Sequence, residues 1–172
     1  YVARFHVWGV IGVGAKLLVR HAEGDGSGAK GGVNRLDYIA CLRQHLLPLL
    51  KKLRRGCPEK RWLFMQDGAS IHTAKEVTAF LAAHGVDVVL GWPSSSPDLN
   101  PIENWWGVLA RRLGPKSINN INNTKENSDA LWETLQCIAA EEKVQAEVDR
   151  LVLSFGSRVQ ECVARKGKWI KK

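Results

Sequence analysis

The chain is 172 residues long, carries a formal net charge of +8 and is 45% hydrophobic. This length suits one domain, spanning residues 1–172, and the hydrophobic fraction supports a packed core, which excludes a disordered chain. The positive charge favours an anionic partner, nucleic acid first and an acidic membrane surface second, although many globular proteins are mildly basic. The sequence has no run of about 18 apolar residues, so we expect no membrane span.

The four cysteines form no CxxC pair and have no histidine at zinc-finger spacing. We therefore expect reduced, structural thiols in an intracellular protein. The start of the chain does not resemble a secretory signal, because Arg4 interrupts its first apolar stretch. The first residue is Tyr1 and not Met, so we expect the chain to be a fragment of something longer.

The first part of the chain predicts a β-hairpin, with strands over residues 5–11 and 15–20 and a glycine-containing turn between them. The glycine-rich segment 23–32 predicts a mobile loop. Its glycines and lysine do not follow the GxxxxGK[ST] order, which disfavours a phosphate-binding loop.

A helix is expected from Asn34, as its N-cap, to about Leu53, with a kink or break at Pro48. The end of this helix and the residues after it are rich in lysine and arginine between positions 51 and 61. These cations are either a solvated helix end or contacts for DNA phosphate.

Residues 61–90 predict a strand, a helix and a second strand. The first strand, 61–66, has the continuous apolar character of a strand buried on both faces. The helix covers 72–84 and is closed by Gly85, and the second strand covers 86–90. Short links between these elements predict two parallel strands with a right-handed crossover, and hence an α/β fold.

The remainder of the chain predicts helices. One begins at Asn100-Pro101, and Glu103 lies at capping-box spacing from Asn100. At least one of Trp105 and Trp106 must pack into the core, which we favour over stacking on DNA. A polar break is expected at 114–127, followed by helices over 128–146, 148–155 and 158–165.

Two carboxylates carry the predicted chemistry. Asp67 follows an apolar parallel strand, the place where open α/β sheets bind ligands. Glu103 lies in the first turn of a helix, after a loop stiffened by prolines. Taken singly, Asp67 could cap its own loop and Glu103 could satisfy helix donors. Together they could hold a divalent metal, as phosphoryl transfer on nucleic acid requires.

Three further polar residues lie near these acids. His72 could contact phosphate or orient a metal-bound water, and a helix-start histidine without chemistry is an equal alternative. Asp98 and Asn100 flank Leu99, and we favour turn and cap hydrogen bonds for them over metal ligation.

The stretches Gln66–Ala74 (QDGASIHTA) and Trp92–Trp106 (WPSSSPDLNPIENWW) resemble the catalytic domain of the mariner superfamily of DNA transposases. The resemblance covers nearly the whole chain. It implies an RNase H-like domain with a mixed central sheet flanked by helices, and a DDE triad in which Asp67 matches the second acid and Glu103 the third. It also implies two Mg²⁺ (or Mn²⁺) ions, transposon-end and target DNA as partners, a homodimer, and a nuclear location in a eukaryotic cell.

The chain departs from the family pattern in three ways. One more residue than usual separates the two acids, and Gly68 replaces the usual Asn. The first acid of the family lies on a strand upstream of the opening hairpin, so that strand is expected to be missing here. Neither Asp25 nor Asp37 fits its place. We therefore expect weak or absent catalysis from this chain, and the alternative is a non-catalytic, transposon-derived domain that binds DNA or protein.

Overall fold

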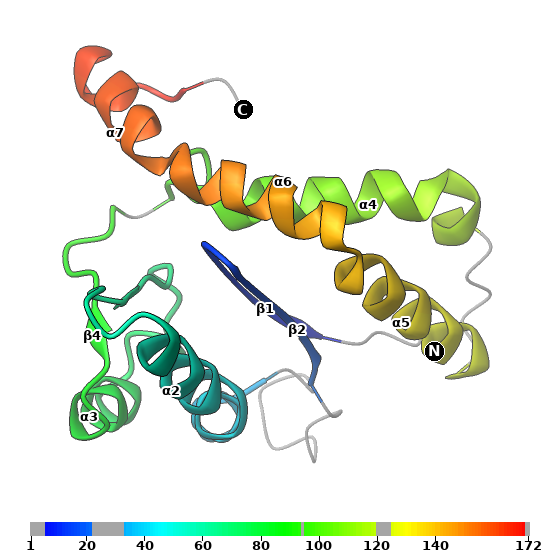
Figure 1. Ribbon diagram of the computed structural model, residues 1–172, viewed down its shortest axis with the longest axis horizontal. Coiled ribbons are helices and arrows are strands. Elements are labelled where there is room, and N and C mark those ends of the chain that lie inside the picture. Colours follow the sequence, from blue (N-terminus) through cyan, green and yellow to red (C-terminus); the bar gives the residue numbers. More distant parts are fainter. Residues whose placement is uncertain (1–5, 22–32, 94, 120–124, 171–172) are drawn as a thin grey trace. The chain divides into compact units, whose positions relative to one another are not determined.

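A computed structural model describes residues 6–21, 33–93, 95–119 and 125–170. Contacts divide the chain into two compact units. Unit 1 consists of Tyr1–Arg20 and Ser96–Lys172, and unit 2 of His21–Ser95. Figure 1 labels the helices and strands of both. Each unit contains one pair of strands, which forms its own two-stranded sheet.

The sheet of unit 1 is the predicted hairpin. Strands β1 (Val7–Gly12) and β2 (Ala15–Arg20) pair antiparallel, with Gly12 opposite Ala15. The two-residue turn between them ends in Gly14, whose φ of 70° is a conformation that glycine adopts without steric cost. The prediction of a hairpin at this position is confirmed.

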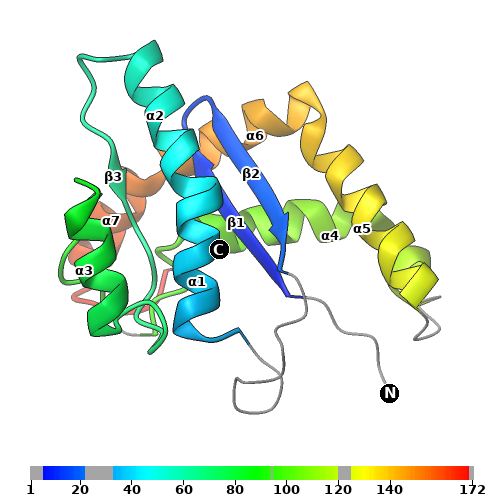
Figure 2. The same ribbon diagram turned by 90° about the horizontal axis from the view of Figure 1, so that it is seen from below.

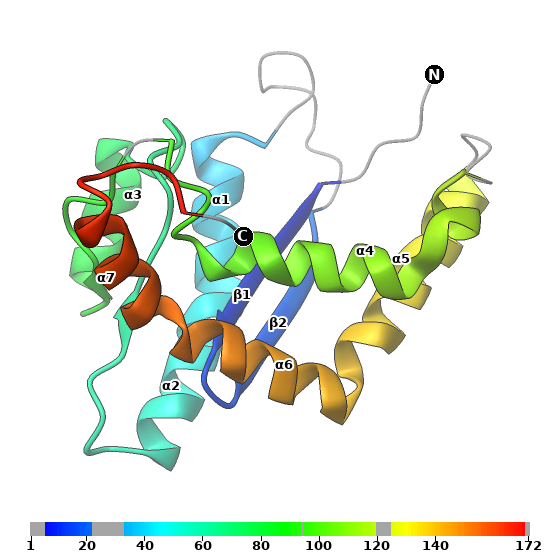
Figure 3. The same cartoon turned by 90° about the horizontal axis from the view of Figure 1, so that it is seen from above.

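Four helices complete unit 1. Helices α4, α5 and α6 contact the hairpin, with α4 crossing β1, whereas α7 extends from the end of α6 (Figure 3). A break at Glu141, which has an extended ψ of 135°, separates two of them, so the predicted single helix over 128–146 is wrong in its boundaries. The helices are α4 (Pro101–Asn119), α5 (Lys125–Ala140), α6 (Glu142–Leu153) and α7 (Phe155–Ala164).

The expected polar break at 114–127 is also partly wrong. Helix α4 continues to Asn119 beyond a kink at Gly114, where φ is 72° and ψ is 159°. Glycine allows this local change of direction at low steric cost, so the helix resumes after it instead of ending. Residues 120–124 lie outside the described part of the chain.

The core of unit 1 is formed by the facing sides of α4, α5 and α6. Arg112 on α4 adds a part-buried ion-pair network, with Nη1 2.8 Å from Glu141 and Nη2 2.6 Å from Glu147. The network joins α4 to Glu147 on α6 and to Glu141, the residue just before α6. The buried core residues are Trp105, Val108, Leu109, Leu135, Ile138, Ala139, Val144 and Val148.

One face of the hairpin meets these helices, as the two-residue period of strands requires. Ile11 and Leu18 pack against the core of unit 1. Lys16 donates to the carbonyl of Glu141 at 3.3 Å, and Arg20 donates to the hydroxyl of Ser128 at 3.0 Å.

Gly9 is the point of closest approach between the hairpin and α4. A Cβ at this position would lie 2.6 Å from Cη2 of Trp106 and 2.8 Å from Cζ3 of Trp105. The two indole rings are stacked, with centroids 5.1 Å apart, and Trp105 is fully buried. The expectation that at least one of these tryptophans packs into the core is confirmed.

Unit 2 begins with a long helical segment. Helix α1 (Arg35–Cys41), a π-helical turn (Leu42–Leu46) and α2 (Leu47–Gly56) follow one another without interruption (Figure 2). Asn34 caps the start through a complete capping box with Asp37. The π-helical turn comes just before Pro48, which lacks an N–H for the helical ladder, so the expected disturbance is a widened turn and not a break.

The parallel strand pair of unit 2 is confirmed, but both strands are shorter than predicted. Strand β3 (Leu63–Phe64) pairs with β4 (Asp87–Val88). Phe64 is buried, whereas Leu63 is 56% exposed, so the prediction of a strand buried on both faces is wrong. Only two strands pair in the described part of this sheet, so it shields few side chains of either strand from solvent.

Helix α3 (Lys75–Ala83) connects the two strands. It begins three residues later than predicted, because residues 70–72 form a turn. Gly85 follows it with a φ of 59°, the left-handed conformation expected of a helix-terminating glycine. The predicted loop 23–32 lies outside the described residues. No helix among those residues is both long enough and apolar enough to cross a membrane.

We expect Gly9→Ala to lower the free energy of unfolding by about 1–3 kcal/mol, the usual cost of overpacking against rigid neighbours. Urea unfolding followed by tryptophan fluorescence measures this. Gly12→Ala is the matched control on the same strand, because its Cβ would lie 3.8 Å from its nearest neighbour, Cβ of Ala15. Equal stability of the two variants would show that the hairpin can move away from α4 without cost.

Candidate metal-binding carboxylates

Asp67 lies in the loop after β3, and its side chain is 56% exposed. Both of its hydrogen bonds end on Oδ1, which accepts from Nδ1 of His72 at 2.6 Å and from the amide of Ala69 at 3.1 Å. Oδ2 has no hydrogen-bond partner among the described residues. The carboxylate is therefore fixed by one oxygen, while the other remains available to a ligand.

A short chain of contacts holds His72 in place. Nε2 of Gln66 donates to the carbonyl of His72 at 2.9 Å, and the hydroxyl of Tyr38 donates to Oε1 of Gln66 at 2.9 Å. The Tyr38 and His72 rings also contact each other, with centroids 4.4 Å apart, and Tyr38 is almost fully buried. His72 is thereby positioned to orient Asp67, with the Nδ1 proton on the side of the carboxylate.

Glu103 lies in the first turn of α4 and is partly buried. Asn100 caps this helix, since its Oδ1 accepts from the amide of Ile102 at 3.2 Å. The Glu103 carboxylate has no hydrogen bond or ion pair in the part of the chain that the structure describes, so the capping box predicted with Asn100 does not form. The helix start is satisfied without Glu103, which leaves this carboxylate free.

Asp98 is buried, with 5% of its surface exposed, and it connects the loop before α4 to the end of the chain. Its Oδ2 accepts from the amide of Ile170 at 2.9 Å, and its carbonyl accepts from Nη1 of Arg158 at 3.0 Å. Asn100 thus makes the expected cap, whereas the Asp98 carboxylate accepts a long-range hydrogen bond and not the turn or cap bond that was favoured for it.

Asp67 belongs to unit 2 and Glu103 to unit 1. Within the described residues, no group of three or more His, Cys, Asp and Glu side chains could enclose a metal by itself. Hard oxygen donors in small number nevertheless suit Mg²⁺, which keeps several waters and is usually bound by one or two carboxylates together with substrate phosphates. Each of the two carboxylates is therefore a ligand of the kind that such an ion binds.

Cysteine chemistry is not favoured at this site. The four cysteines are unpaired, and Cys41 is buried. Burial raises the pKa of the Cys41 thiol to about 11, so this thiol stays protonated at neutral pH and is a poor nucleophile.

Sequence patterns alone did not identify the residues that support these acids. Tyr38, which no local motif connects to His72, contacts the ring of that histidine, and Arg158 and Ile170 contact Asp98 from more than fifty residues away along the chain. Only Gln66 had a signal, because it opens the QDGASIHTA stretch.

Residues 30–125, more than half of the chain, match the DDE superfamily endonuclease family, and the chain belongs to this family. It is 30% identical to the transposable element Tc3 transposase of Caenorhabditis elegans over 149 residues, 85% of this chain and 41% of that protein. It is 36% identical to the Tc1 transposase of the same organism over 104 residues, 60% of this chain and 36% of that protein. The chain thus spans well under half the length of these relatives.

Solved structures show the same fold. The crystal structure of the catalytic domain of Mos1 mariner transposase matches with a TM-score of 0.64 and 21% identity, over 97% of this chain and 82% of that one. Mos1 transposase in a paired-end complex with its left transposon end matches with a TM-score of 0.60 and 23% identity, over 91% and 41%. The predicted RNase H-like α/β fold and the resemblance to mariner transposases are confirmed.

The chain therefore resembles the catalytic domain of the Tc1/mariner cut-and-paste transposases. DDE endonucleases depend on divalent metal, and the Mos1 catalytic domain has been solved with Mg and with Mn.

We expect Asp98→Ala to release the end of the chain, because the amide of Ile170 loses its acceptor. The variant should lose about 1–3 kcal/mol of unfolding free energy, the cost of a buried unpaired donor, and amide exchange at Ile170 should accelerate. Hydrogen–deuterium exchange measures the second effect. Asp98→Asn, which keeps an acceptor oxygen, should retain most of the protection. Unchanged exchange at Ile170 in Asp98→Ala would contradict the assignment.

Proposed function

We propose that this chain contributes Asp67 and Glu103 as metal-binding carboxylates to a transposase that cuts and joins DNA. One observation carries the proposal. Glu103 has no partner in the described structure, and Asp67 keeps one oxygen free while His72 holds the other. Carboxylates that serve only as caps or ion pairs would be engaged by neighbouring donors.

The chemistry is a phosphodiester displacement. When bound, Mg²⁺ or Mn²⁺ supplies electrostatic stabilisation to the attacking and leaving oxygens. Asp67 and Glu103 would hold the ions, and His72 would keep the carboxylate of Asp67 in one orientation through its Nδ1–H. Such support matters because groups that orient metal ligands typically change metal affinity by about 10- to 100-fold when removed.

In the complete protein, water would cleave DNA at the ends of the element, and the freed 3′-hydroxyl would then attack target DNA. The relatives named above support this proposal through the family, and the Mos1 paired-end complex supports transposon-end DNA as the partner. Assembly as a homodimer and a nuclear location are parts of the same proposal.

A non-catalytic, transposon-derived DNA- or protein-binding domain is the second candidate. The net charge of +8 favours it, because a basic surface attracts an anionic partner without any need for a metal site. The two candidates differ in metal binding, because a domain that only binds DNA or protein has no need of carboxylates that are kept free.

We expect calorimetry to detect Mg²⁺ and Mn²⁺ binding to the chain. Asp67→Asn and Glu103→Gln should each weaken it by at least about tenfold, since each removes a ligand charge and not merely a supporting bond. Glu133→Gln is the matched control, because Glu133 is an exposed carboxylate on α5, outside the two sequence stretches that carry the acids.

Circular dichroism and the thermal midpoint establish that each variant is folded before its binding is compared. Absence of metal binding by the folded parent chain, or equal binding by all three variants, would favour the non-catalytic candidate.

A further inference from the structure

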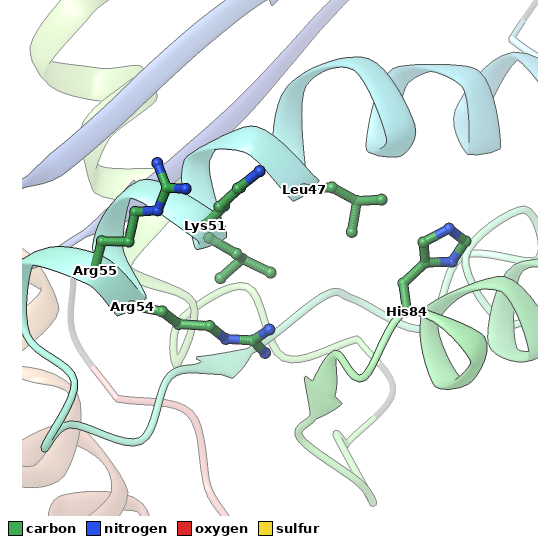
Figure 4. Close-up of a pocket in the computed structure, with 6 residues that line it drawn as sticks. Leu47, Lys51, Arg54, Arg55 and His84 are labelled. Carbon is green, nitrogen blue, oxygen red and sulfur yellow. The ribbon is translucent and has the colours of Figure 1, made fainter.

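Unit 2 contains a basic pocket on the side of the second half of α2. The pocket has a volume of about 350 Å³ and is lined by Leu47, Leu50, Lys51, Arg54 and Arg55 of α2, together with His84 at the end of α3. Figure 4 shows these side chains around it, with His84 facing α2 from the opposite side. No carboxylate is among the residues that line the pocket.

The positive charge of the pocket is largely unneutralised. Helix α2 carries four lysines and arginines and no acidic residue. Lys51 and Arg55 are exposed and have no hydrogen bond or ion pair among the described residues. Arg54 uses Nη2 to donate to the carbonyl of Gly85 at 2.7 Å, which leaves its other donors available.

His84 is held in a fixed orientation beside these cations. Nδ1 donates to the carbonyl of Phe80 at 2.8 Å, and the two rings contact each other with centroids 4.3 Å apart. Because a carbonyl can only accept, the proton must lie on Nδ1, and Nε2 is the ring nitrogen left for a ligand. Protonation of Nε2 would add another donor to the pocket.

Stabilisation of the helix dipole does not account for this arrangement. Cations favour the C-terminal end of a helix, but the effect is confined to about the last turn. Arg54 and Arg55 lie in the last turn of α2, whereas Lys51 lies in its middle. A concave surface with an apolar base of Leu47 and Leu50 and a rim of cations instead matches a ligand with an anionic group beside an apolar one.

We infer that this pocket binds a backbone phosphate of DNA, with the adjacent deoxyribose against the two leucines. The inference rests on the proposed function, which supplies DNA as the anionic partner. It adds a contact surface formed by residues other than Asp67 and Glu103. Lysine and arginine contacts to phosphate are independent of base sequence, so the pocket positions the duplex and does not select it.

The test is fluorescence anisotropy with a labelled DNA duplex of about 20 base pairs and arbitrary sequence, titrated at salt concentrations from about 50 to about 200 mM. EDTA is present throughout, so that metal binding plays no part. Lys51→Gln combined with Arg55→Gln should weaken binding by about tenfold and reduce the slope of log K against log salt by about 0.9, the contribution of the one phosphate that the pocket neutralises.

Lys52→Gln is the matched control, because it removes the same charge from the same helix at a residue that does not line the pocket. It should change the slope by less than half as much as Lys51→Gln alone.

The inference would be overturned if the double variant left the slope of log K against log salt unchanged. It would also be overturned if Lys52→Gln changed this slope as much as Lys51→Gln does. Polyglutamate that competes more strongly than DNA of equal total charge would assign the pocket to an acidic protein segment, which also overturns it.

Failure of the proposed function gives a different pattern. The double variant Lys51→Gln/Arg55→Gln should bind Mg²⁺ as the parent chain does. If the parent chain did not bind metal but still bound DNA through the pocket, only the proposed metal site would be refuted.

Discussion

The close approach of Gly9 to the paired indoles of Trp105 and Trp106 sets the geometry of unit 1. No larger residue leaves room for the strand there, and the rings that fill the space belong to the first turns of α4. The same turns carry Glu103. Packing against the hairpin therefore helps to place the first turn of α4, which carries Glu103, and the buried Asp98–Ile170 hydrogen bond fixes the loop that leads into this helix.

The two acids are prepared for a ligand by different means. Asp67 is oriented by hydrogen bonds and contacts that run through His72 and Gln66 to the buried Tyr38, and its Oδ1 is engaged in this support. Glu103 is oriented by its helix, and neither of its carboxylate oxygens has a hydrogen-bond partner among the described residues. In unit 2 the orienting network and the basic pocket lie on the same helical segment, since Tyr38 belongs to α1 and Lys51 to α2. One helical segment thereby supports the loop of Asp67 and carries the cations of the pocket.

The sequence predicted most of what local chemistry determines. The hairpin, the Asn34 cap, the start of α4 and the parallel strand pair depend on neighbouring residues, and all were found. Strand lengths and the break at Glu141 depend on tertiary packing, so they were misjudged. The candidate acids came from motifs, whereas their supports came from distant positions. Whether Glu103 would cap its helix could not be decided from spacing, because Asn100 satisfies the helix start by itself.

The central claim is that Asp67 and Glu103 are metal-binding carboxylates. Its most direct test is a crystal structure of the chain with Mn²⁺, with anomalous scattering recorded to locate any bound ion. The account predicts anomalous density within coordination distance of a carboxylate oxygen of each acid, Oδ2 in the case of Asp67. A structure in which neither carboxylate approaches an ion, or in which Glu103 turns to a protein donor instead, would contradict it.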